Sequence, residues 1–157
     1  MLSILLNPIV PNLKSYIKDD WDFLRKLPRN IKQPCNMYTV DIVSLYTSIP
    51  HELGIKAIEY YIHKYQNELP ERFTKNCIIE ITKFLLENNN FTFNHQMYHQ
   101  LTGTAMGGNF APPYAILTIG YLEESYLYIE IPKVFSKEDS EFIINAYKRF
   151  MDDGFIT

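Results

Sequence analysis

The sequence has little of the positive charge that a free-standing nucleic-acid-binding domain uses. Its 157 residues include 15 Lys and Arg against 18 Asp and Glu, which gives a formal net charge of −3. Affinity for nucleic acid comes mainly from Lys and Arg side chains that neutralise phosphates. The composition therefore argues against an independent nucleic-acid binder, and any role on nucleic acid requires bound cations or basic surfaces outside this segment.

Cysteine is equally scarce. Cys35 and Cys77 are the only two, they lie far apart, and no CxxC or paired Cys/His spacing accompanies them. This excludes a disulfide framework and a zinc site of the usual spacing. A reducing, intracellular setting is expected, with no signal that distinguishes nucleus from cytoplasm.

Segments typical of export or membrane insertion are missing as well. Met1 to Val10 is apolar but has no basic region and no small-residue cleavage site, so a secretory signal is not predicted. Leu101 to Leu122 carries no charged residue over a length that could cross a bilayer. Glycines, threonines and two adjacent prolines interrupt it, so we expect no membrane helix.

Hydrophobic residues make up 46% of the chain and aromatic residues 15%, which is enough for a real core. The length predicts one globular domain. Apolar periodicity and turn residues predict mixed helix and strand. An amphipathic helix is expected over 13–27, with Leu13, Ile17, Trp21 and Leu24 on one face, followed by a buried strand over 37–45. Two helices should follow, one from about 50 to 69 with Ile58, Tyr61, Ile62 and Tyr65 inward, and one from Thr74 to Asn88 with Ile78, Ile81 and Leu85 inward. The rest of the chain predicts a hairpin over 91–98, a long helix from Ala111 with Ala115, Leu122 and Tyr126 aligned and Glu123 and Glu124 facing water, a surface loop over 132–140, and a closing hairpin over 147–156.

Three carboxylates stand out against this background. Asp41 is flanked by Val40 and Ile42 in a strand that is otherwise apolar, and an unpaired buried carboxylate would cost several kcal/mol. A structural partner such as Arg149, or a cap, is one explanation. Asp152 and Asp153 lie in the closing hairpin, and an Asp-Gly turn is the favoured explanation when they are considered alone.

Together the three residues predict a more specific chemistry. An acid in one strand and an acidic pair in a neighbouring hairpin could converge on divalent cations. Phosphoryl transfer uses two such metal ions about 3.5–4 Å apart. Oxygen ligands and retained waters favour Mg²⁺.

Four segments, in the right order, resemble the core motifs of reverse transcriptases, particularly those of Penelope-like retroelements. They are LKSYIKDDWDFLRKL at 13–27, DIVSLYTSIP at 41–50, GTAMGGNFAPPYA at 103–115 and YKRFMDDGFI at 147–156. The resemblance implies an α+β polymerase palm, in which a small antiparallel sheet packs against helices. Residues 1–157 would form a partial reverse transcriptase domain, with a short fingers/palm lead-in and without the thumb and most of the fingers.

The resemblance also implies roles for individual residues. Asp41 and Asp152 would bind two Mg²⁺ ions, with Mn²⁺ as a substitute; Asp153 would assist them, and the Ile42 carbonyl would be a further ligand. Tyr46 would be the aromatic gate that excludes a ribose 2′-hydroxyl, although a Tyr after a strand is more commonly a core residue. The nucleotide pocket would include Met106 and Gly107.

The activity implied is transfer of dNTPs to the 3′-hydroxyl of a primer on an RNA or DNA template. Two departures from the family pattern are Gly108-Asn109, where Ser-Pro is usual, and Phe150, where Tyr is commoner. The alternatives are a catalytically inactive element remnant with a structural or interaction role, and an RNA-templated RNA polymerase, which the aromatic Tyr46 disfavours. Residues 1–157 alone are expected to bind primer-template weakly and to polymerise nothing measurable.

Overall fold

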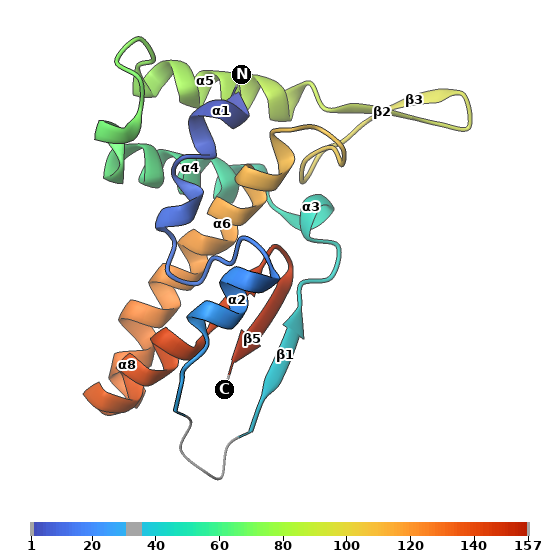
Figure 1. Ribbon diagram of the computed structural model, residues 1–157. Helices are drawn as coiled ribbons and strands as arrows, with labels where there is room; N and C mark the ends of the chain where they lie inside the picture. The colour runs from blue at the N-terminus through green and yellow to red at the C-terminus, as the bar shows by residue number, and fades with distance from the viewer. Residues whose placement is uncertain (1, 31–35, 157) are drawn as a thin grey trace. The chain divides into compact units, whose positions relative to one another are not determined.

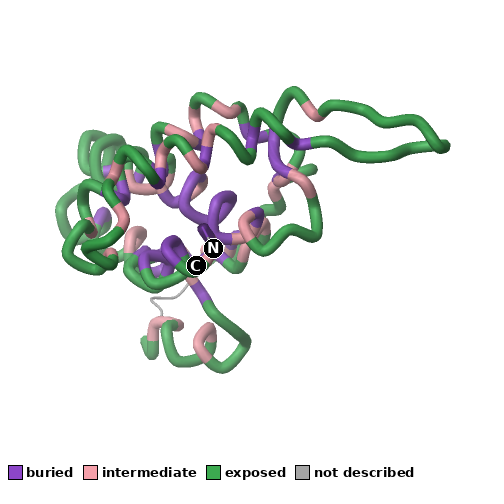
Figure 2. Tube along the Cα trace, turned by 90° about the horizontal axis from the view of Figure 1, so that it is seen from above, coloured by how far each residue is buried: buried purple, intermediate pink, exposed green. Residues whose placement is uncertain are grey.

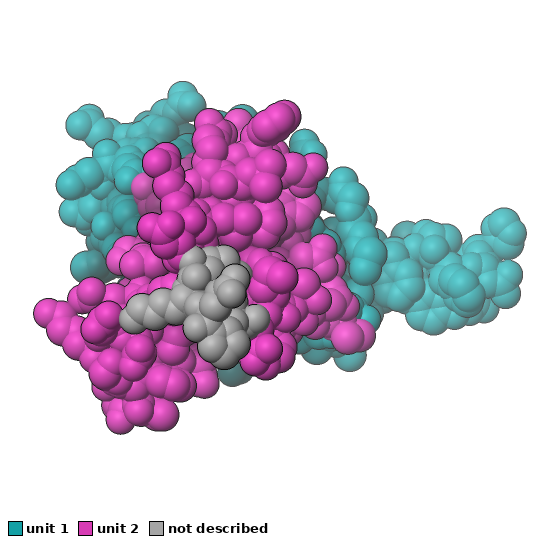
Figure 3. Space-filling model, turned by 60° about the horizontal axis from the view of Figure 1, so that its bottom comes forward, with its two compact units in different colours: residues 1–10, 44–119 teal, residues 11–43, 120–157 magenta. Residues whose placement is uncertain are grey.

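The computed structural model describes residues 2–30 and 36–156, so Cys35 lies outside the described residues, whereas Cys77 is an exposed free thiol. The chain forms two compact units, coloured separately in Figure 3. Unit 1 comprises residues 1–10 and 44–119, and unit 2 comprises residues 11–43 and 120–157. Each unit mixes helices with a small antiparallel sheet, which confirms the expected α+β composition.

Unit 1 is mainly helical. Its elements are α1 (Leu2–Leu6), α3 (Leu45–Ser48), α4 (His51–Lys64), the 3-10 turn η2 (Gln66–Glu68), α5 (Lys75–Glu87), β2 (Asn90–Phe93), β3 (Gln96–His99) and the first part of α6 (Ala111–Ser125). Helices α4 and α5 run alongside one another (Figure 1). The buried side of α4 contains Ala57, Ile58, Tyr61 and Ile62, which confirms the predicted inward stripe except at Tyr65. That residue is half-buried and follows the end of the helix, which stops at Lys64 instead of near residue 69.

Helix α5 begins and ends where its capping residues predict. The Thr74 hydroxyl accepts a hydrogen bond from the Cys77 amide at 3.3 Å, and Asn88 closes the last turn. The predicted inward face was wrong in detail. Ile78, Thr82 and Leu86 are buried, whereas Leu85 is 39% exposed. Thr82 tolerates burial because its hydroxyl donates to the Ile78 carbonyl at 2.8 Å.

The predicted hairpin over 91–98 is confirmed. Strands β2 and β3 pair antiparallel, and the turn residues Asn94 and His95 both have positive φ, as a type I′ turn requires. All residues of both strands are exposed, as the green ribbon in Figure 2 shows. The aromatic rings of Phe91 and Tyr98 stack across the strands, with centroids 5.6 Å apart.

Helix α6 starts at Ala111, as predicted, and is apolar on every side in its first two turns. Residues Tyr114, Ala115, Leu117 and Thr118 are fully buried. A helix that is hydrophobic all round belongs in a protein interior. No helix in the described ranges 2–30 and 36–156 is both long and apolar enough to cross a membrane.

Unit 2 contains the sheet that bears the predicted acids. Its elements are α2 (Asp20–Lys26), β1 (Tyr38–Asp41), the last residues of α6, the π-helical turn η3 (Tyr126–Glu130), α7 (Ile131–Val134), α8 (Lys137–Ala146), β4 (Lys148–Phe150) and β5 (Asp153–Ile156), and the 3-10 turn η1 (Val10–Asn12) spans the boundary of the two units. The strand order is β1-β5-β4, with both pairings antiparallel.

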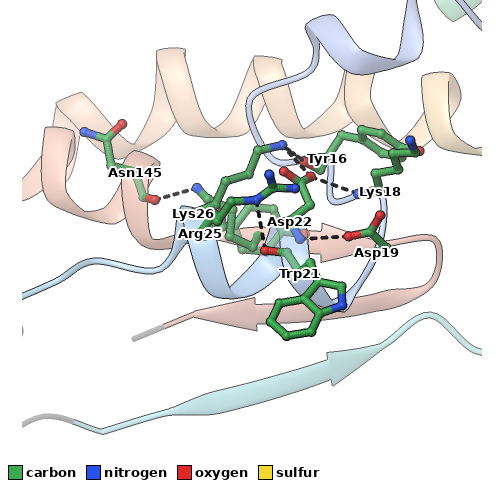
Figure 4. Close-up of polar contacts among 10 residues, drawn as sticks. Tyr16, Lys18, Asp19, Trp21, Asp22, Arg25, Lys26 and Asn145 are labelled. Carbon is green, nitrogen blue, oxygen red and sulfur yellow. Dashed lines mark hydrogen bonds and ion pairs between the residues drawn. The ribbon is translucent and has the colours of Figure 1, made fainter.

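The helix predicted over 13–27 is much shorter. The Asp19 carboxylate accepts from the Asp22 amide at 2.8 Å and starts α2 only at Asp20 (Figure 4). The residues before α2 do not form a helix. The Arg149 amide donates to the Ser15 carbonyl, so this segment pairs with β4. On α2 itself, Trp21 is 75% exposed, so the predicted apolar stripe does not exist.

The loop predicted over 132–140 is also wrong, because most of it is helical. Helix α8 starts after Ser136, whose hydroxyl accepts from the Asp139 amide at 3.1 Å. Glu138 and Asp139 lie in the first turn, where acidic side chains interact favourably with the helix dipole. The Ser136 cap and the acidic first turn are therefore a helix-start signal that the sequence itself contains.

Candidate metal-binding and nucleotide-binding residues

The strand that carries Asp41 is exposed, contrary to prediction. It spans Tyr38–Asp41 instead of 37–45, and all four of its residues are exposed, with Tyr38 at 58% and Val40 at 57%. The strand lies at the edge of the sheet and pairs only with β5 among the described strands. The inference that Asp41 is a buried carboxylate in need of compensation is therefore wrong.

The sheet nevertheless brings the predicted acids together within unit 2. In the β1–β5 register, Asp41 lies directly opposite Asp153, and the two strands run side by side in Figure 1. The Ile42 amide donates to the Asp152 carbonyl at 3.1 Å, which extends the pairing by one residue. Side chains of directly opposed residues share one face of a sheet. Asp41 and Asp153 therefore project on the same side.

The sequence predicted an Asp-Gly turn at the acidic pair, and this prediction is wrong. The hairpin turn consists of Met151 and Asp152, because Phe150 and Asp153 already pair with one another. Met151 has a φ of 54°, which is uncommon for a residue other than glycine. Asp153 and Gly154 open strand β5, so the conformation at Met151 determines how the acidic pair leaves the turn.

None of the three carboxylates is neutralised by another described residue. Within the described ranges, the side chains of Asp41, Asp152 and Asp153 form no ion pair or hydrogen bond. Like charges placed directly opposite on neighbouring strands destabilise a sheet. A hard cation with oxygen ligands would offset that repulsion, so the donor chemistry fits Mg²⁺. As the side chains stand, no three acidic, His or Cys groups of the described residues surround a common point.

Arg149 does not pair with Asp41, which excludes the structural partner considered from the sequence. Its guanidinium, only 1% exposed, instead forms an ion pair with Glu123 through Nε and Nη2. The Glu123 carboxylate also accepts from the Ser15 hydroxyl at 2.6 Å and the Tyr147 hydroxyl at 2.7 Å. The prediction that Glu123 faces water is therefore wrong. Burial, with the adjacent Glu123 charge, raises the pKa of Tyr147.

A half-open cavity of about 330 Å³ adjoins Asp153. Its lining combines three aromatic rings with charged groups: Phe23, Phe150, Phe155, Asp19, Asp20, Lys148 and Asp153, with Ile17, Thr39 and Gly154. The Lys148 ammonium donates to the carbonyls of Asn145 and Tyr147 at the end of α8. Burial, and then the neighbouring Lys26 charge, lowers the pKa of Lys148. Of these lining residues, the sequence predicted a role in a metal or nucleotide site only for Asp153.

Tyr46 lies in unit 1, in α3, and is half-buried. Its backbone carbonyl accepts from the Thr104 amide at 2.7 Å, and the Gly103 amide donates to the Ile49 carbonyl at 2.8 Å. A Cβ atom at Gly103 would lie 2.2 Å from the Tyr46 carbonyl oxygen. The second motif therefore packs directly on the backbone of the first motif, at a distance that only glycine permits.

Met106 and Gly107 also lie in unit 1 and face open space. Met106 is 67% exposed. Gly107 has a φ of +96°, and no atom lies within 4 Å of the position a Cβ would take. In the chain alone, glycine at this position is required by backbone conformation and not by a close neighbour. The predicted approach of template and nucleotide to this loop stays a prediction.

The sequence was compared with protein-family models and with curated proteins. No protein-family model matches the chain, and no curated protein matches it.

Proposed function

We propose that this chain is the palm segment of a reverse transcriptase, which transfers dNTPs to a primer 3′-hydroxyl by two-metal nucleotidyl transfer. The observation that carries the proposal is the register of the unit 2 sheet. Asp41, from the first motif, lies opposite Asp153, from the last motif, and the Ile42 amide binds the Asp152 carbonyl. More than one hundred residues of sequence separate these acids, and no described side chain neutralises them.

The chemistry of the donors supports magnesium. Asp41, Asp152 and Asp153 would provide carboxylate oxygens, and Ile42 a backbone carbonyl, a set that suits a hard cation. Bound Mg²⁺ supplies Lewis-acid activation of the primer hydroxyl and stabilisation of the leaving pyrophosphate. The protein's own part is to hold Asp41 and Asp153 on one sheet face, with Asp152 in the adjoining turn, so that cations rather than the acids themselves would meet the negative charge of the triphosphate.

Tyr46, Met106 and Gly107 would select and seat the nucleotide. An aromatic ring beside the sugar excludes a 2′-hydroxyl by steric clash, which is specificity through repulsion. The packing of Gly103 on the Tyr46 carbonyl supports this role, because it ties the backbone of the gate residue to the loop that bears Met106. Movement of that loop would then be transmitted to the gate.

The metal site is tested first, on the 157-residue chain. Titration with Mn²⁺, followed by electron paramagnetic resonance of the free ion, should detect binding in the wild type that Asp41→Asn and Asp153→Asn each weaken by more than tenfold. Glu141→Gln, an exposed carboxylate on α8, is the matched control and should bind as the wild type does. Equal affinities in all four proteins would refute the site.

The opposed acids make a second, independent prediction about stability. Without divalent cations, Asp41→Asn should raise the free energy of unfolding by about 0.5 kcal/mol, because it removes a like-charge cross-strand pair. With Mn²⁺ at about one hundred times its Kd, the wild type should gain about 2.7 kcal/mol and the variant much less. Urea unfolding in EDTA and in Mn²⁺ measures both effects. A variant that is less stable than the wild type in EDTA would contradict the repulsion argument.

Polymerisation is tested in a longer form of the protein that includes thumb and fingers segments. Primer extension with dNTPs and Mg²⁺ should be abolished by Asp152→Asn while the circular dichroism spectrum stays unchanged. Tyr46→Ala should retain extension with dNTPs and gain incorporation of ribonucleotides. Retained synthesis in Asp152→Asn would refute the proposed function.

A further inference from the structure

Arg149 lies at the centre of a buried polar network in unit 2. Its guanidinium binds Glu123 through two nitrogens, with Nη2 to Oε2 at 3.1 Å. The same carboxylate is held by the Ser15 and Tyr147 hydroxyls. Glu123 lies on α6, a helix of 15 residues, so the guanidinium is anchored to a helix outside the hairpin.

A third nitrogen of Arg149 reaches the turn between β4 and β5. Nη1 donates to the Met151 carbonyl at 2.6 Å. Met151 is the residue with a φ of 54°, and its carbonyl belongs to the peptide that leads into Asp152. A left-handed conformation costs a residue other than glycine roughly 1–2 kcal/mol. A charge-assisted hydrogen bond to the adjacent carbonyl is strong enough to offset that cost.

The backbone of Arg149 is fixed as firmly as its side chain. Its amide donates to the Ser15 carbonyl at 2.7 Å, and its carbonyl accepts from the Ile17 amide at 2.9 Å. A buried ion pair contributes little net stability compared with apolar residues of the same volume. Stability alone therefore does not explain an arginine at this position. The forked guanidinium does explain it, because one part binds Glu123 while another reaches the turn.

We infer that Arg149 is a positioning residue for the metal site: it holds the Met151–Asp152 turn in the conformation that presents Asp152 and Asp153 to a divalent cation, and Glu123 holds Arg149. The inference deepens the proposed function and rests on it. Arg149 itself contacts neither cation nor substrate.

The test compares Arg149→Lys with Ser15→Ala in the 157-residue chain. Lysine keeps the buried positive charge and the ion pair with Glu123, but it lacks the fork that reaches the Met151 carbonyl. Ser15→Ala removes one hydrogen bond to the same Glu123 carboxylate and leaves the Met151 bond intact. Glu123→Gln, which keeps the acceptor but not its charge, serves as a third variant in case Arg149→Lys does not fold.

Two measurements are made where urea titrations show each variant to be folded. The first is Mn²⁺ affinity, which Arg149→Lys should weaken about tenfold, equivalent to about 1.4 kcal/mol, and which Ser15→Ala should change by less than about twofold. The second is the nuclear magnetic resonance signal of the Met151 methyl group, labelled with ¹³C. It should shift or broaden in Arg149→Lys and stay in place in Ser15→Ala. Glu123→Gln should have effects on Mn²⁺ affinity and on the Met151 signal that lie between those of Arg149→Lys and Ser15→Ala.

The outcomes separate the two proposals. If the wild type binds no Mn²⁺, the proposed function and this inference both fail. If the wild type binds Mn²⁺ and Arg149→Lys binds it equally well with an unchanged Met151 signal, only the positioning role fails. If Arg149→Lys and Ser15→Ala weaken Mn²⁺ binding equally, the network acts through general stability, and the positioning role again fails.

Discussion

Gly103 lies in close contact with the backbone of the first motif, so Gly103→Ala should destabilise the protein strongly. The added Cβ would lie 2.2 Å from the Tyr46 carbonyl oxygen and 2.6 Å from the Thr47 Cα. Both are backbone atoms, so no side-chain rotation relieves the overlap. The φ of +74° at this residue also disfavours any side chain.

The magnitude follows from three contributions. The positive φ costs alanine about 1–2 kcal/mol. Overpacking of this kind costs about 1–3 kcal/mol. Separation of the two segments would also weaken the Gly103–Ile49 and Thr104–Tyr46 backbone hydrogen bonds, each worth about 1 kcal/mol. Because the chain will relieve the overlap partly by giving up these bonds, we expect a loss of about 3–5 kcal/mol rather than the full sum.

Gly107→Ala is the matched control. Its φ of +96° imposes a similar conformational cost, but no atom lies within 4 Å of the new Cβ. The expected loss is therefore only about 1–2 kcal/mol. Urea unfolding followed by far-ultraviolet circular dichroism measures both, and hydrogen exchange of the Thr104 amide localises the effect. If the two variants lost the same stability to within about 0.5 kcal/mol, the close approach at Gly103 would not exist.

Two further predictions concern Tyr114 and Asp22. The Tyr114 hydroxyl is fully buried and, within the described residues, has no hydrogen-bond partner. Tyr114→Phe should therefore raise the free energy of unfolding by about 1 kcal/mol in urea titrations, and a loss of stability would reveal a partner for the hydroxyl. The ion pair with Lys26, followed by the Lys18 amide, lowers the pKa of Asp22. The stabilisation is present above about pH 4 and is lost as pH falls through the lowered pKa. Asp22→Asn should thus cost about 0.5 kcal/mol at neutral pH and nothing at the acid end, and a difference that persists in acid would contradict this.

Elements with local signals were predictable from the sequence. Thr74 and Asn88 mark the two ends of α5, because capping uses side chains within one turn of the helix end. The Asn94-His95 turn could be predicted because only a few residue types adopt positive φ there. In these cases the residues that determine the structure are sequence neighbours, so no knowledge of distant contacts was needed.

The predictions that were wrong concern residues whose partners lie far away in the sequence. Glu123 was expected to face water, yet its partners Arg149 and Ser15 lie 26 and 108 residues away in the sequence. Periodicity along α6 contains no information about such partners. The segment before α2 failed for the same reason, because its hydrogen bonds are made to β4 and not within a helix.

Burial of Asp41 and its proximity to the acidic pair are independent properties of the strand. Apolar neighbours predicted a buried strand, and burial was the argument for a special role. The strand is an exposed edge, so that argument fails, but the pairing with Asp153 does not depend on it. Antiparallel register alone places the two acids face to face, and exposure leaves their charges accessible to a cation from solvent. An edge position therefore makes the metal hypothesis easier to test, because substitution of Asp41 removes a charge without opening a cavity in the core.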